Sequence, residues 1–491
     1  MPLCLGLLAC TAWLPAQELR TPSAPSQPRI HGPEVYGVRP GKPVIYRIPA
    51  TGARPMTYRV QGLPASLRLD ASTGIITGDA PPSPGRYAVT LRATNSKGSA
   101  RRALTFVVGD KLALTPPMGW NSWYTHYNRV TDRTMRAAAD AMIASGMADY
   151  GYSYVNVDDC WMRLAGEGAR DAQGQLLTNE HFPDMQALAG YIHAKGLKAG
   201  LYTSPGPATC AKYEGAYGHE EQDARLFAEW GFDFLKYDWC GYSRIAKDRS
   251  LPELKKPYER MSAILQTLNR DIVHNFCQYG MGDVWKWGEA AGGECWRTTG
   301  DLGLEKDTRL PGFYSIGFKN AAAWEYARPG AWNDPDYILI GWYGDARGMR
   351  VPQKARLSAG EQYSYMSMWS LMAAPLIFSG DMEKLDPFTL NVLCNAEVLA
   401  VNQDVLGRQA RIVRKTEEEF ILAKPLADGS VAVGLFNIGE NQRTLAVTAG
   451  ELGLKRVRGV RDVWRQRELG RSLESLRVQL PPHGVEMFRV R

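Results

Sequence analysis

The 491-residue chain has no long hydrophobic run, few histidines and no common nucleotide-binding or serine-hydrolase motif. No apolar stretch approaches the roughly 20 residues that a membrane-spanning helix needs. The seven histidines are dispersed without the spacing of metal ligands, and neither a G-x-S-x-G elbow nor a phosphate-binding glycine loop occurs. We therefore expect no transmembrane segment, no bound metal and no cofactor.

The basic excess is not concentrated enough to indicate a nucleic-acid-binding protein. The formal charge of +7 comes from scattered Lys and Arg residues. One local concentration, over residues 455–471, is interrupted by acidic residues and has a strand-like pattern, which favours a solvated face. Aromatic residues are abundant instead: fourteen Trp and twenty-three Tyr suit either core packing or stacking on the apolar faces of sugars.

The first 20 residues are typical of the apolar part of a secretory signal peptide, although they lack its positive start. Residues 7–10, Leu-Leu-Ala-Cys, also loosely resemble a lipoprotein cleavage box. We expect an exported protein, secreted or periplasmic, with lipoprotein anchoring as an alternative. Residues 21–30 are rich in Pro and Ser and indicate a linker.

Three folded domains are expected after this linker. Over 31–109, short alternating runs separated by Gly, Pro and Asn turns predict an immunoglobulin-like β-sandwich. Over 110–406 the pattern changes to strand then helix, with strand ends near 122, 159, 205, 239, 280, 301, 338 and 381. Eight such units predict a (β/α)8 TIM barrel. Alternating runs over 407–491 predict a second, antiparallel β-sandwich.

Three predicted barrel strands run into acidic residues. Asp158 and Asp159 follow one strand, and Asp238 and Asp301 end two others. An isolated Asp would more often be a loop or helix cap, but the carboxyl ends of barrel strands meet at one rim, where barrel enzymes place their chemistry. Lys236 lies two residues before Asp238 and so points to the same strand face, where its charge would favour an ionised carboxylate. The sequence thus predicts a site with several carboxylates.

Five segments in order resemble the signatures of glycoside hydrolase family 27, the retaining α-galactosidases. They are Met118-Gly119-Trp120-Asn121-Ser122-Trp123, Val157-Asp158-Asp159-Cys160-Trp161, Leu235-Lys236-Tyr237-Asp238-Trp239-Cys240, Cys295-Trp296-Arg297-Thr298-Thr299-Gly300-Asp301 and Pro329-Gly330-Ala331-Trp332-Asn333-Asp334-Pro335-Asp336. The resemblance covers about residues 112–491 and leaves the N-terminal sandwich outside it. It implies hydrolysis of terminal α-galactosides.

The resemblance also implies roles for individual residues. Asp238 would be the nucleophile, with a low pKa, and Asp301 the acid/base, which must begin protonated. Asp158 and Asp159 would hold the axial and primary hydroxyls of galactose. The other expected substrate contacts are Lys236, Arg297 at the 2-hydroxyl, Trp123 and Tyr202 in the pocket wall, Asp336 in a supporting position, and Gln278 near the 2-hydroxyl.

The same resemblance implies how the cysteines are paired. It implies the disulfides Cys210–Cys240 and Cys277–Cys295 between neighbouring rim loops, which would agree with export. The family partner of Cys160 is missing near residue 128, so Cys160 is expected to be a free buried thiol. Buried free cysteines throughout are the alternative.

Several alternatives remain open at this point. The barrel could use Asp158, Asp238 and Asp301 to bind a divalent cation, or the chain could be a sugar-binding protein without activity. Within the family, a β-L-arabinopyranosidase or an α-N-acetylgalactosaminidase could share the scaffold, and Gln278 leaves the preference at the 2-position undecided. Two short Asp side chains leave room for C6, which favours galactose. The oligomeric state and the role of the N-terminal sandwich stay undecided.

Overall fold

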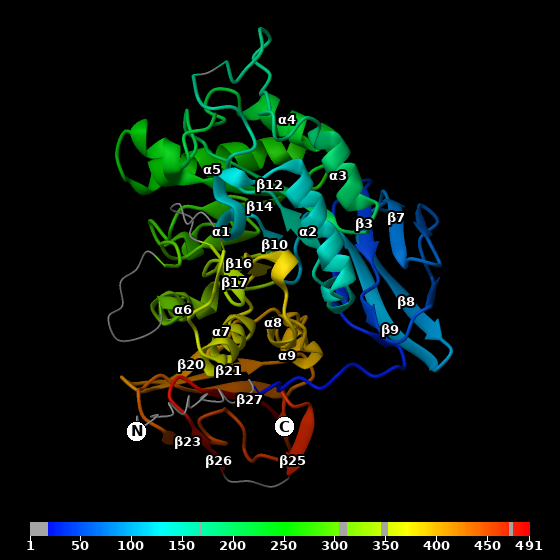
Figure 1. Ribbon diagram of the computed structural model, residues 1–491, viewed down its shortest axis with the longest axis vertical. Coiled ribbons are helices and arrows are strands. Elements are labelled where there is room, and N and C mark those ends of the chain that lie inside the picture. The colour runs from blue at the N-terminus through cyan, green and yellow to red at the C-terminus, as the bar shows by residue number, and fades with distance from the viewer. Residues whose placement is uncertain (1–17, 167, 304–311, 345–351, 471–474) are drawn as a thin grey trace, which may run out of the picture.

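The computed structural model describes residues 18–166, 168–303, 312–344, 352–470 and 475–491, in three domains (Figure 1). The sandwich drawn in blue lies at one side of the central barrel, and the C-terminal sandwich drawn in orange and red lies at one end of the molecule. The expected fold class is confirmed. The expected signal peptide falls almost wholly on residues 1–17, outside the described residues. No helix in the described ranges has the length and apolar character needed to span a membrane.

The N-terminal domain is a β-sandwich whose strands alternate between core and solvent. On β8, Val89, Leu91 and Ala93 are buried, and they pack with Leu104 and Phe106 of β9. One sheet has the order β2-β9-β8-β5 and another β3-β7-β6, with a short β1-β4 pair beside them. The strands are β1 (Arg29–Ile30), β2 (Val35–Val38), β3 (Pro43–Arg47), β4 (Ala50–Thr51), β5 (Thr57–Gln61), β6 (Leu67–Leu69), β7 (Ile75–Asp79), β8 (Gly85–Asn95) and β9 (Gly98–Val108).

The central domain is a barrel of eight parallel strands, in the order β16-β15-β14-β13-β12-β11-β10-β19. A parallel bridge between Ile338 and Phe378 links the region after β16 to β19 and closes the ring. Most strand residues are buried, as parallel strands covered on both sides require. The strands are β10 (Met118–Asn121), β11 (Tyr154–Asn156), β12 (Lys198–Thr203), β13 (Phe234–Asp238), β14 (Val273–Cys277), β15 (Cys295–Arg297), β16 (Trp332–Asp334) and β19 (Leu376–Phe378).

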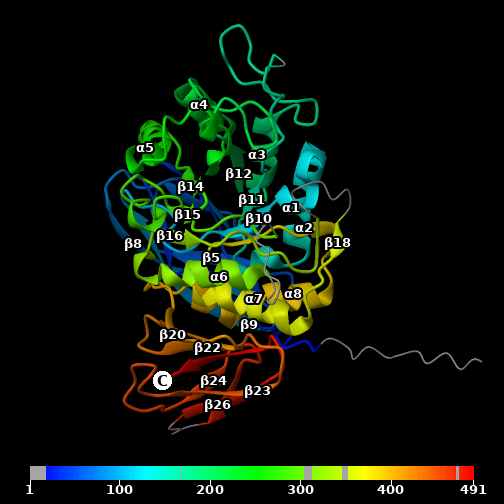
Figure 2. The same cartoon turned by 90° about the vertical axis from the view of Figure 1, so that its left-hand side faces the viewer.

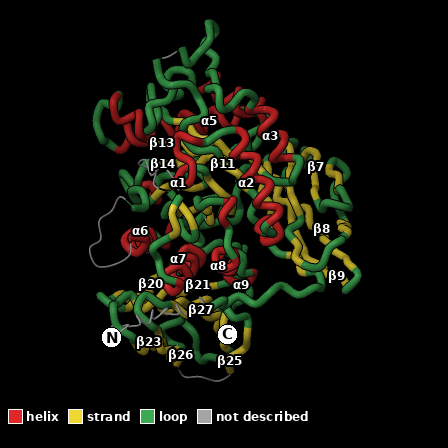
Figure 3. The backbone as a smooth tube through the Cα atoms, viewed as in Figure 1, coloured by secondary structure: helices red, strands yellow, loops and turns green. Residues whose placement is uncertain are grey.

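Helices surround this ring of strands (Figure 3). Thr131 caps α2 through a reciprocal capping box with Thr134, and Gly231 ends α4 in the left-handed conformation. The helices are α1 (Trp123–His126), α2 (Asp132–Ala144), α3 (Met185–His193), α4 (Glu220–Trp230), α5 (Leu251–Thr267), α6 (Gly312–Ala322), α7 (Ala359–Leu371), α8 (Pro387–Leu393) and α9 (Ala396–Asn402). Two short strands, β17 (Trp342–Tyr343) and β18 (Gln353–Lys354), pair antiparallel.

The C-terminal domain is an antiparallel sandwich that packs on α7 through β22 and β27, as the side view shows (Figure 2). One sheet has the order β20-β21-β22-β27-β24-β25, and β23 pairs with β26. The strands are β20 (Arg411–Lys415), β21 (Glu419–Pro425), β22 (Val431–Asn437), β23 (Arg443–Thr448), β24 (Val460–Asp462), β25 (Arg467–Gly470), β26 (Ser475–Leu480) and β27 (Val485–Val490).

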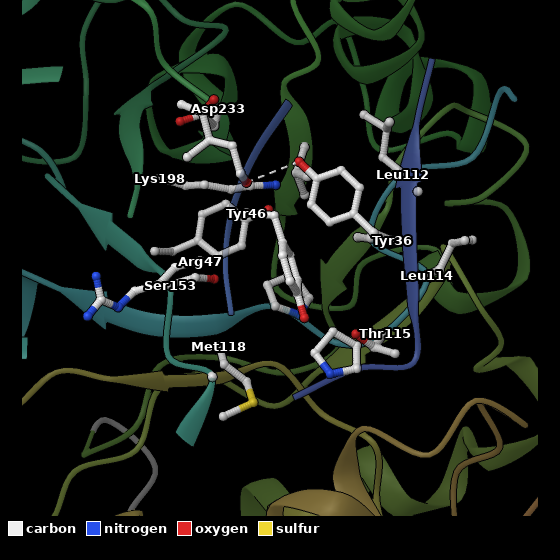
Figure 4. Close-up of a pocket in the computed structure, with 18 of the residues that line it drawn as sticks. Tyr36, Tyr46, Arg47, Leu112, Leu114, Thr115, Met118, Ser153, Lys198 and Asp233 are labelled. Carbon is white, nitrogen blue, oxygen red and sulfur yellow. Dashed lines mark hydrogen bonds between the residues drawn. The ribbon is translucent and has the colours of Figure 1, made fainter. Parts of the chain in front are cut away.

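The N-terminal sandwich covers the end of the barrel where the strands begin. Arg39 binds the Asp271 carboxylate, with Nε 2.5 Å from Oδ1. Next to this contact lies a cavity of about 120 Å³ between the two domains, into which Tyr36 and Tyr46 project from the sandwich (Figure 4). The Lys198 ammonium lies over the Tyr36 ring, 4.6 Å from its centroid. This cavity therefore lies at the interface between the two domains, remote from the carboxyl ends of the barrel strands.

The segment 21–30, expected to be a linker, is held against the rest of the protein. The Thr21 amide donates to Asn391 Oδ1 at 2.9 Å, and Asn391 Nδ2 donates back to the Thr21 carbonyl at 2.8 Å. Its last two residues already form β1, paired with β4. The chain thus crosses from the C-terminal sandwich to the N-terminal one along an attached path, visible as the blue run in Figure 1.

Candidate active site

A cavity of about 270 Å³ opens at the carboxyl ends of the barrel strands. Eight of the ten predicted site residues line it, together with eight others. Its lining comprises Trp123, Tyr124, Tyr127, Asp158, Tyr202, Cys210, Ala211, Lys236, Asp238, Cys240, Tyr279, Arg297, Asp301, Leu302, Asp336 and Tyr337. The structure therefore brings the carboxylates of the second, fourth and sixth strands to one opening, as the rim argument requires.

Asp238 is the last residue of β13 and is buried in the wall of this cavity. Its Oδ1 accepts a hydrogen bond from the Tyr279 hydroxyl at 2.6 Å and a longer one from the Cys240 amide at 3.4 Å. Burial raises the pKa of Asp238, while the Lys236 ammonium and the Tyr279 hydroxyl oppose that rise. The low pKa expected from the sequence was wrong in direction, because burial outweighs the nearby positive charge.

The lining of the cavity contains a buried ion pair between Lys236 and Asp158, with Nζ 2.9 Å from Oδ2. The same oxygen accepts hydrogen bonds from Asn121 Nδ2 at 2.8 Å and from the Tyr337 hydroxyl at 2.9 Å. Burial alone would lower the pKa of Lys236, but Asp158 raises it well above its usual value. Lys236 is thus a permanent cation beside Asp238, two residues along the same strand.

Asp301 follows β15 in a loop, and Arg297 fixes it from within that strand. Arg297 lies 3.2 Å from Asp301 Oδ1 and 3.2 Å from Asp336 Oδ2, so one guanidinium bridges two carboxylates. It also donates to the Gly300 carbonyl at 2.7 Å, which holds the loop itself. Burial raises the pKa of Asp336 to about 6, against the effect of Arg297. Asp301 remains about one-third exposed, as a group that exchanges protons with solvent needs to be.

Two of the predicted substrate contacts lie behind the cavity wall instead. Asp159 accepts hydrogen bonds from the amides of Cys160 at 2.7 Å and Ala211 at 2.9 Å, and burial raises its pKa to about 7. Gln278 binds the backbone of Met281, accepting from its amide at 2.6 Å and donating to its carbonyl at 2.9 Å. Neither is among the described residues that line the cavity, and both hold rim loops in place.

The sequence argument missed four tyrosines that line the cavity. The Tyr337 hydroxyl binds Asp158, and the Tyr279 hydroxyl binds Asp238. Tyr124 donates to the carbonyl of Leu302, next to Asp301, at 2.9 Å, and Tyr127 completes the set. Their only signal in the sequence is position, because Tyr124, Tyr279 and Tyr337 each follow a predicted site residue directly.

One of the two expected disulfides is present. Cys210 and Cys240 are bonded and form part of the cavity wall. The expected bond between Cys277 and Cys295 was wrong, since both are free and buried, and Cys160 is free and buried as expected. Strand register explains the difference: Asn275 pairs with Cys295, so Cys277 lies two residues further along β14. Cys277 Sγ lies 3.8 Å from Arg297, whereas Cys295 Sγ contacts Asn275 at 3.1 Å.

Comparison with protein-family models assigns all three domains. Residues 115–404 match the family described as alpha galactosidase A, and residues 419–490 match the alpha galactosidase C-terminal beta sandwich domain. Residues 27–109 match an Ig domain.

Individual relatives agree with this assignment. An alpha-galactosidase of Cyamopsis tetragonoloba is 35% identical over 409 residues, covering 82% of this chain and 93% of the relative. A Bacteroides fragilis structure described as an alpha-galactosidase/melibiase superimposes with a TM-score of 0.89 at 35% identity, over 96% of this chain and all of that one. Alpha-galactosidase I of Mortierella vinacea gives a TM-score of 0.70 at 28% identity, over 78% and 98% of the two chains. The chain therefore belongs to the α-galactosidases of glycoside hydrolase family 27.

Proposed function

We propose that this protein is a retaining exo-α-galactosidase that removes terminal α-D-galactosyl residues from oligosaccharides or glycoconjugates. The observation that carries the proposal is the meeting of Asp238 and Asp301, from strands four and six, in one cavity. Glycoside hydrolysis requires two carboxyl groups that flank the scissile bond. The cavity has a volume of about 270 Å³ and includes the buried Lys236–Asp158 pair in its lining, which suits a single terminal sugar better than the middle of a glycan chain.

The proposed reaction is a double displacement. Asp238 attacks C1 of the galactosyl unit while protonated Asp301 donates its proton to the departing glycosidic oxygen. The new C1–O bond to Asp238 replaces the bond to the leaving group. Asp301, now ionised, takes a proton from water, which attacks C1 and releases galactose with its original configuration. Arg297, 3.2 Å from Asp301 Oδ1, is placed to stabilise the Asp301 carboxylate after it has given up its proton.

Polar groups around the cavity suit a galactose ring. The buried Tyr202 hydroxyl has no hydrogen-bond partner among the described residues, and we propose that a bound sugar hydroxyl supplies one. The Lys236 ammonium and Asp158 offer a donor and an acceptor side by side. Trp123 supplies the apolar surface on which a sugar face can stack.

The positive charge of Lys236 disfavours the alternative in which the carboxylates of the cavity bind a divalent cation. A cation bound by Asp158 and Asp238 would have to displace or tolerate Lys236, whose ammonium is already paired with Asp158. Among the residues that the structure describes, Cys210, Asp238 and Cys240 bring three potential metal ligands together, but the two sulfurs are joined in a disulfide. Hydrolysis that persists in a strong chelator would support the glycosidase mechanism, and loss of activity would favour the cation.

The decisive experiment compares two substrates on the wild-type protein. We expect hydrolysis of 4-nitrophenyl α-D-galactopyranoside, with α-galactose as the first product seen by NMR. The matched 4-nitrophenyl β-L-arabinopyranoside lacks only the hydroxymethyl group and should be cleaved more slowly. Preferential turnover of the arabinoside would overturn the substrate assignment, and β-galactose as first product would overturn the mechanism.

We also propose that the protein is exported. The apolar start of the chain and the Cys210–Cys240 disulfide support this proposal, since disulfides persist in oxidising compartments. Mass spectrometry of the mature protein from its native host tests it. Loss of about the first 20 residues is expected, whereas an intact N-terminus in the cytosolic fraction would contradict export.

A further inference from the structure

The turn after β14 presents an unusual contact to the proposed nucleophile. The Tyr279 hydroxyl donates to Asp238 Oδ1 at 2.6 Å, across 41 residues of sequence. Tyr279 has a positive φ of 64°, a conformation that is costly for a bulky side chain. A strained residue whose shortest polar contact is with a reacting group indicates a functional arrangement.

Neighbouring residues hold this turn rigidly. The side-chain amide of Gln278 makes two hydrogen bonds with the backbone of Met281, at 2.6 and 2.9 Å, and so braces both sides of the turn. Gly280, with φ of 83°, packs so closely that a Cβ there would lie 2.2 Å from the Thr298 carbonyl oxygen. The turn is thereby fixed to the loop that carries Asp301. This gives Gln278 a defined structural role in the turn.

The surroundings of the Tyr279 hydroxyl restrict its position further. It lies 3.1 Å from Cys240 Sγ and 3.8 Å from Cys210 Sγ, so the disulfide forms the other side of its slot. The Arg297 guanidinium lies 5.9 Å from the centroid of the tyrosine ring. Burial raises the pKa of Tyr279 well above its usual value, and the negative charge of Asp238 adds to that rise. Tyr279 therefore remains a donor over the working pH range of any glycosidase.

We propose that Tyr279 is a positioning residue for the nucleophile, which holds Asp238 through Oδ1 so that Oδ2 attacks C1. The proposal rests on the retaining mechanism proposed above. In the first step Oδ2 forms the bond to C1 as the glycosidic bond breaks. In the second step that bond breaks, and the hydrogen bond at Oδ1 stabilises the carboxylate as it regains its charge.

The test replaces Tyr279 with Phe, which keeps the ring against the disulfide and removes only the hydroxyl. Losing a donor to a carboxylate raises the pKa of Asp238, so the acidic limb of kcat/KM should move to higher pH. We expect kcat to fall about 10- to 100-fold, the range for a hydrogen bond to a charged group. Tyr191→Phe, on the outer helix α3, controls for a generic Tyr→Phe effect, since the Tyr191 hydroxyl donates to Asp140 at the surface and Tyr191 does not line the cavity.

Gln278→Leu serves as a second variant that keeps Tyr279 but removes the amide bracing. It should move the acidic limb in the same direction by a smaller amount, and it decides the question if Tyr279→Phe does not fold. If folded Tyr279→Phe has the same kcat as the wild type and the same acidic limb of kcat/KM, the proposal is overturned. If only Gln278→Leu folds, the same result for that variant overturns it. Labelling by a 2-deoxy-2-fluoro-galactosyl fluoride distinguishes a failure of the positioning role from a failure of the proposed retaining mechanism. Label on Asp238 with an unchanged Tyr279→Phe rejects only the positioning role, while label elsewhere rejects the mechanism as well.

Discussion

Lys236 and Asp158 form a buried ion pair, 2.9 Å from Nζ to Oδ2, that joins the second and fourth strand regions in the lining of the cavity. Both side chains are nearly inaccessible to solvent, and the Asp158 carboxylate also accepts hydrogen bonds from Asn121 and Tyr337. The ammonium lies 5.2 Å from the ring centroids of both Tyr202 and Tyr337. The pair therefore shapes the sugar pocket and, through its charge, opposes protonation of Asp238.

We predict strong coupling within this pair. Lys236→Met leaves Asp158 buried beside neutral donors alone, and breaking a buried pair in this way costs about 3–5 kcal/mol of unfolding free energy. The double variant Lys236→Met/Asp158→Asn should lose less than the two single losses added together, since no unpaired charge remains. Urea unfolding of the four proteins measures the coupling. Simple additivity would show that the pair does not act as a unit.

The alanine variants of Asp238 and Asp301 should give different products when azide is added. Asp301→Ala should slow hydrolysis about 10²- to 10⁴-fold, the usual contribution of general acid–base catalysis, and azide should then yield α-galactosyl azide. Azide should restore cleavage by Asp238→Ala only with inversion at C1, because azide takes the place of the nucleophile. The product should then be β-galactosyl azide. NMR of the products distinguishes the anomers. The same anomer from both variants would contradict the assigned roles.

Peptide mapping should find a single disulfide within residues 18–491. Alkylation of the unfolded, unreduced protein should label Cys160, Cys277, Cys295 and Cys394, which are free and buried in the structure. Cys210 and Cys240 should label only after reduction. Mass spectrometry of the alkylated peptides gives the answer directly. A peptide that links Cys277 to Cys295 would contradict the strand register described above.

Lys424 should destabilise the C-terminal sandwich in a pH-dependent way. It is fully buried on β21 with one long hydrogen bond, to the Asn402 carbonyl at 3.4 Å, and burial lowers its pKa from 10.5 to about 7. Below pH 7 the lysine is protonated in both states and the cost is complete. Between pH 7 and 10.5 the folded protein binds fewer protons than the unfolded chain, so stability rises with pH.

Lys424→Met should therefore raise the unfolding free energy by roughly 1–4 kcal/mol at pH 6 and by much less at pH 10. Chemical unfolding at the two pH values measures the difference. Lys455→Met provides the control, because Lys455 is exposed in the same domain and should give no pH-dependent gain. An equal effect of Lys424→Met at both pH values would show that the lysine is not buried in its charged form.

Much of the architecture follows from sequence alone. Apolar strand segments covered on both sides, the helix cap at Thr131 and the stop at Gly231 are local features, and the structure reproduces them. The carboxylates of Asp158, Asp238 and Asp301 reach one rim because parallel strands share a direction. Because the eight parallel strands follow one another around the barrel in sequence order, all their carboxyl ends lie at the same rim.

Tertiary structure alone decided which side chains face the cavity. The backbone beyond the strand ends turns through positive φ at Cys160, Tyr279 and Asp336, and such turns change the direction of each following side chain. As a result Gln278 faces its own loop, while Tyr279 reaches Asp238. Register between β14 and β15 likewise kept Cys277 apart from Cys295. Contacts between distant segments depend on packing that no local pattern records, so the sequence determined the rim, and the fold determined what each rim residue touches.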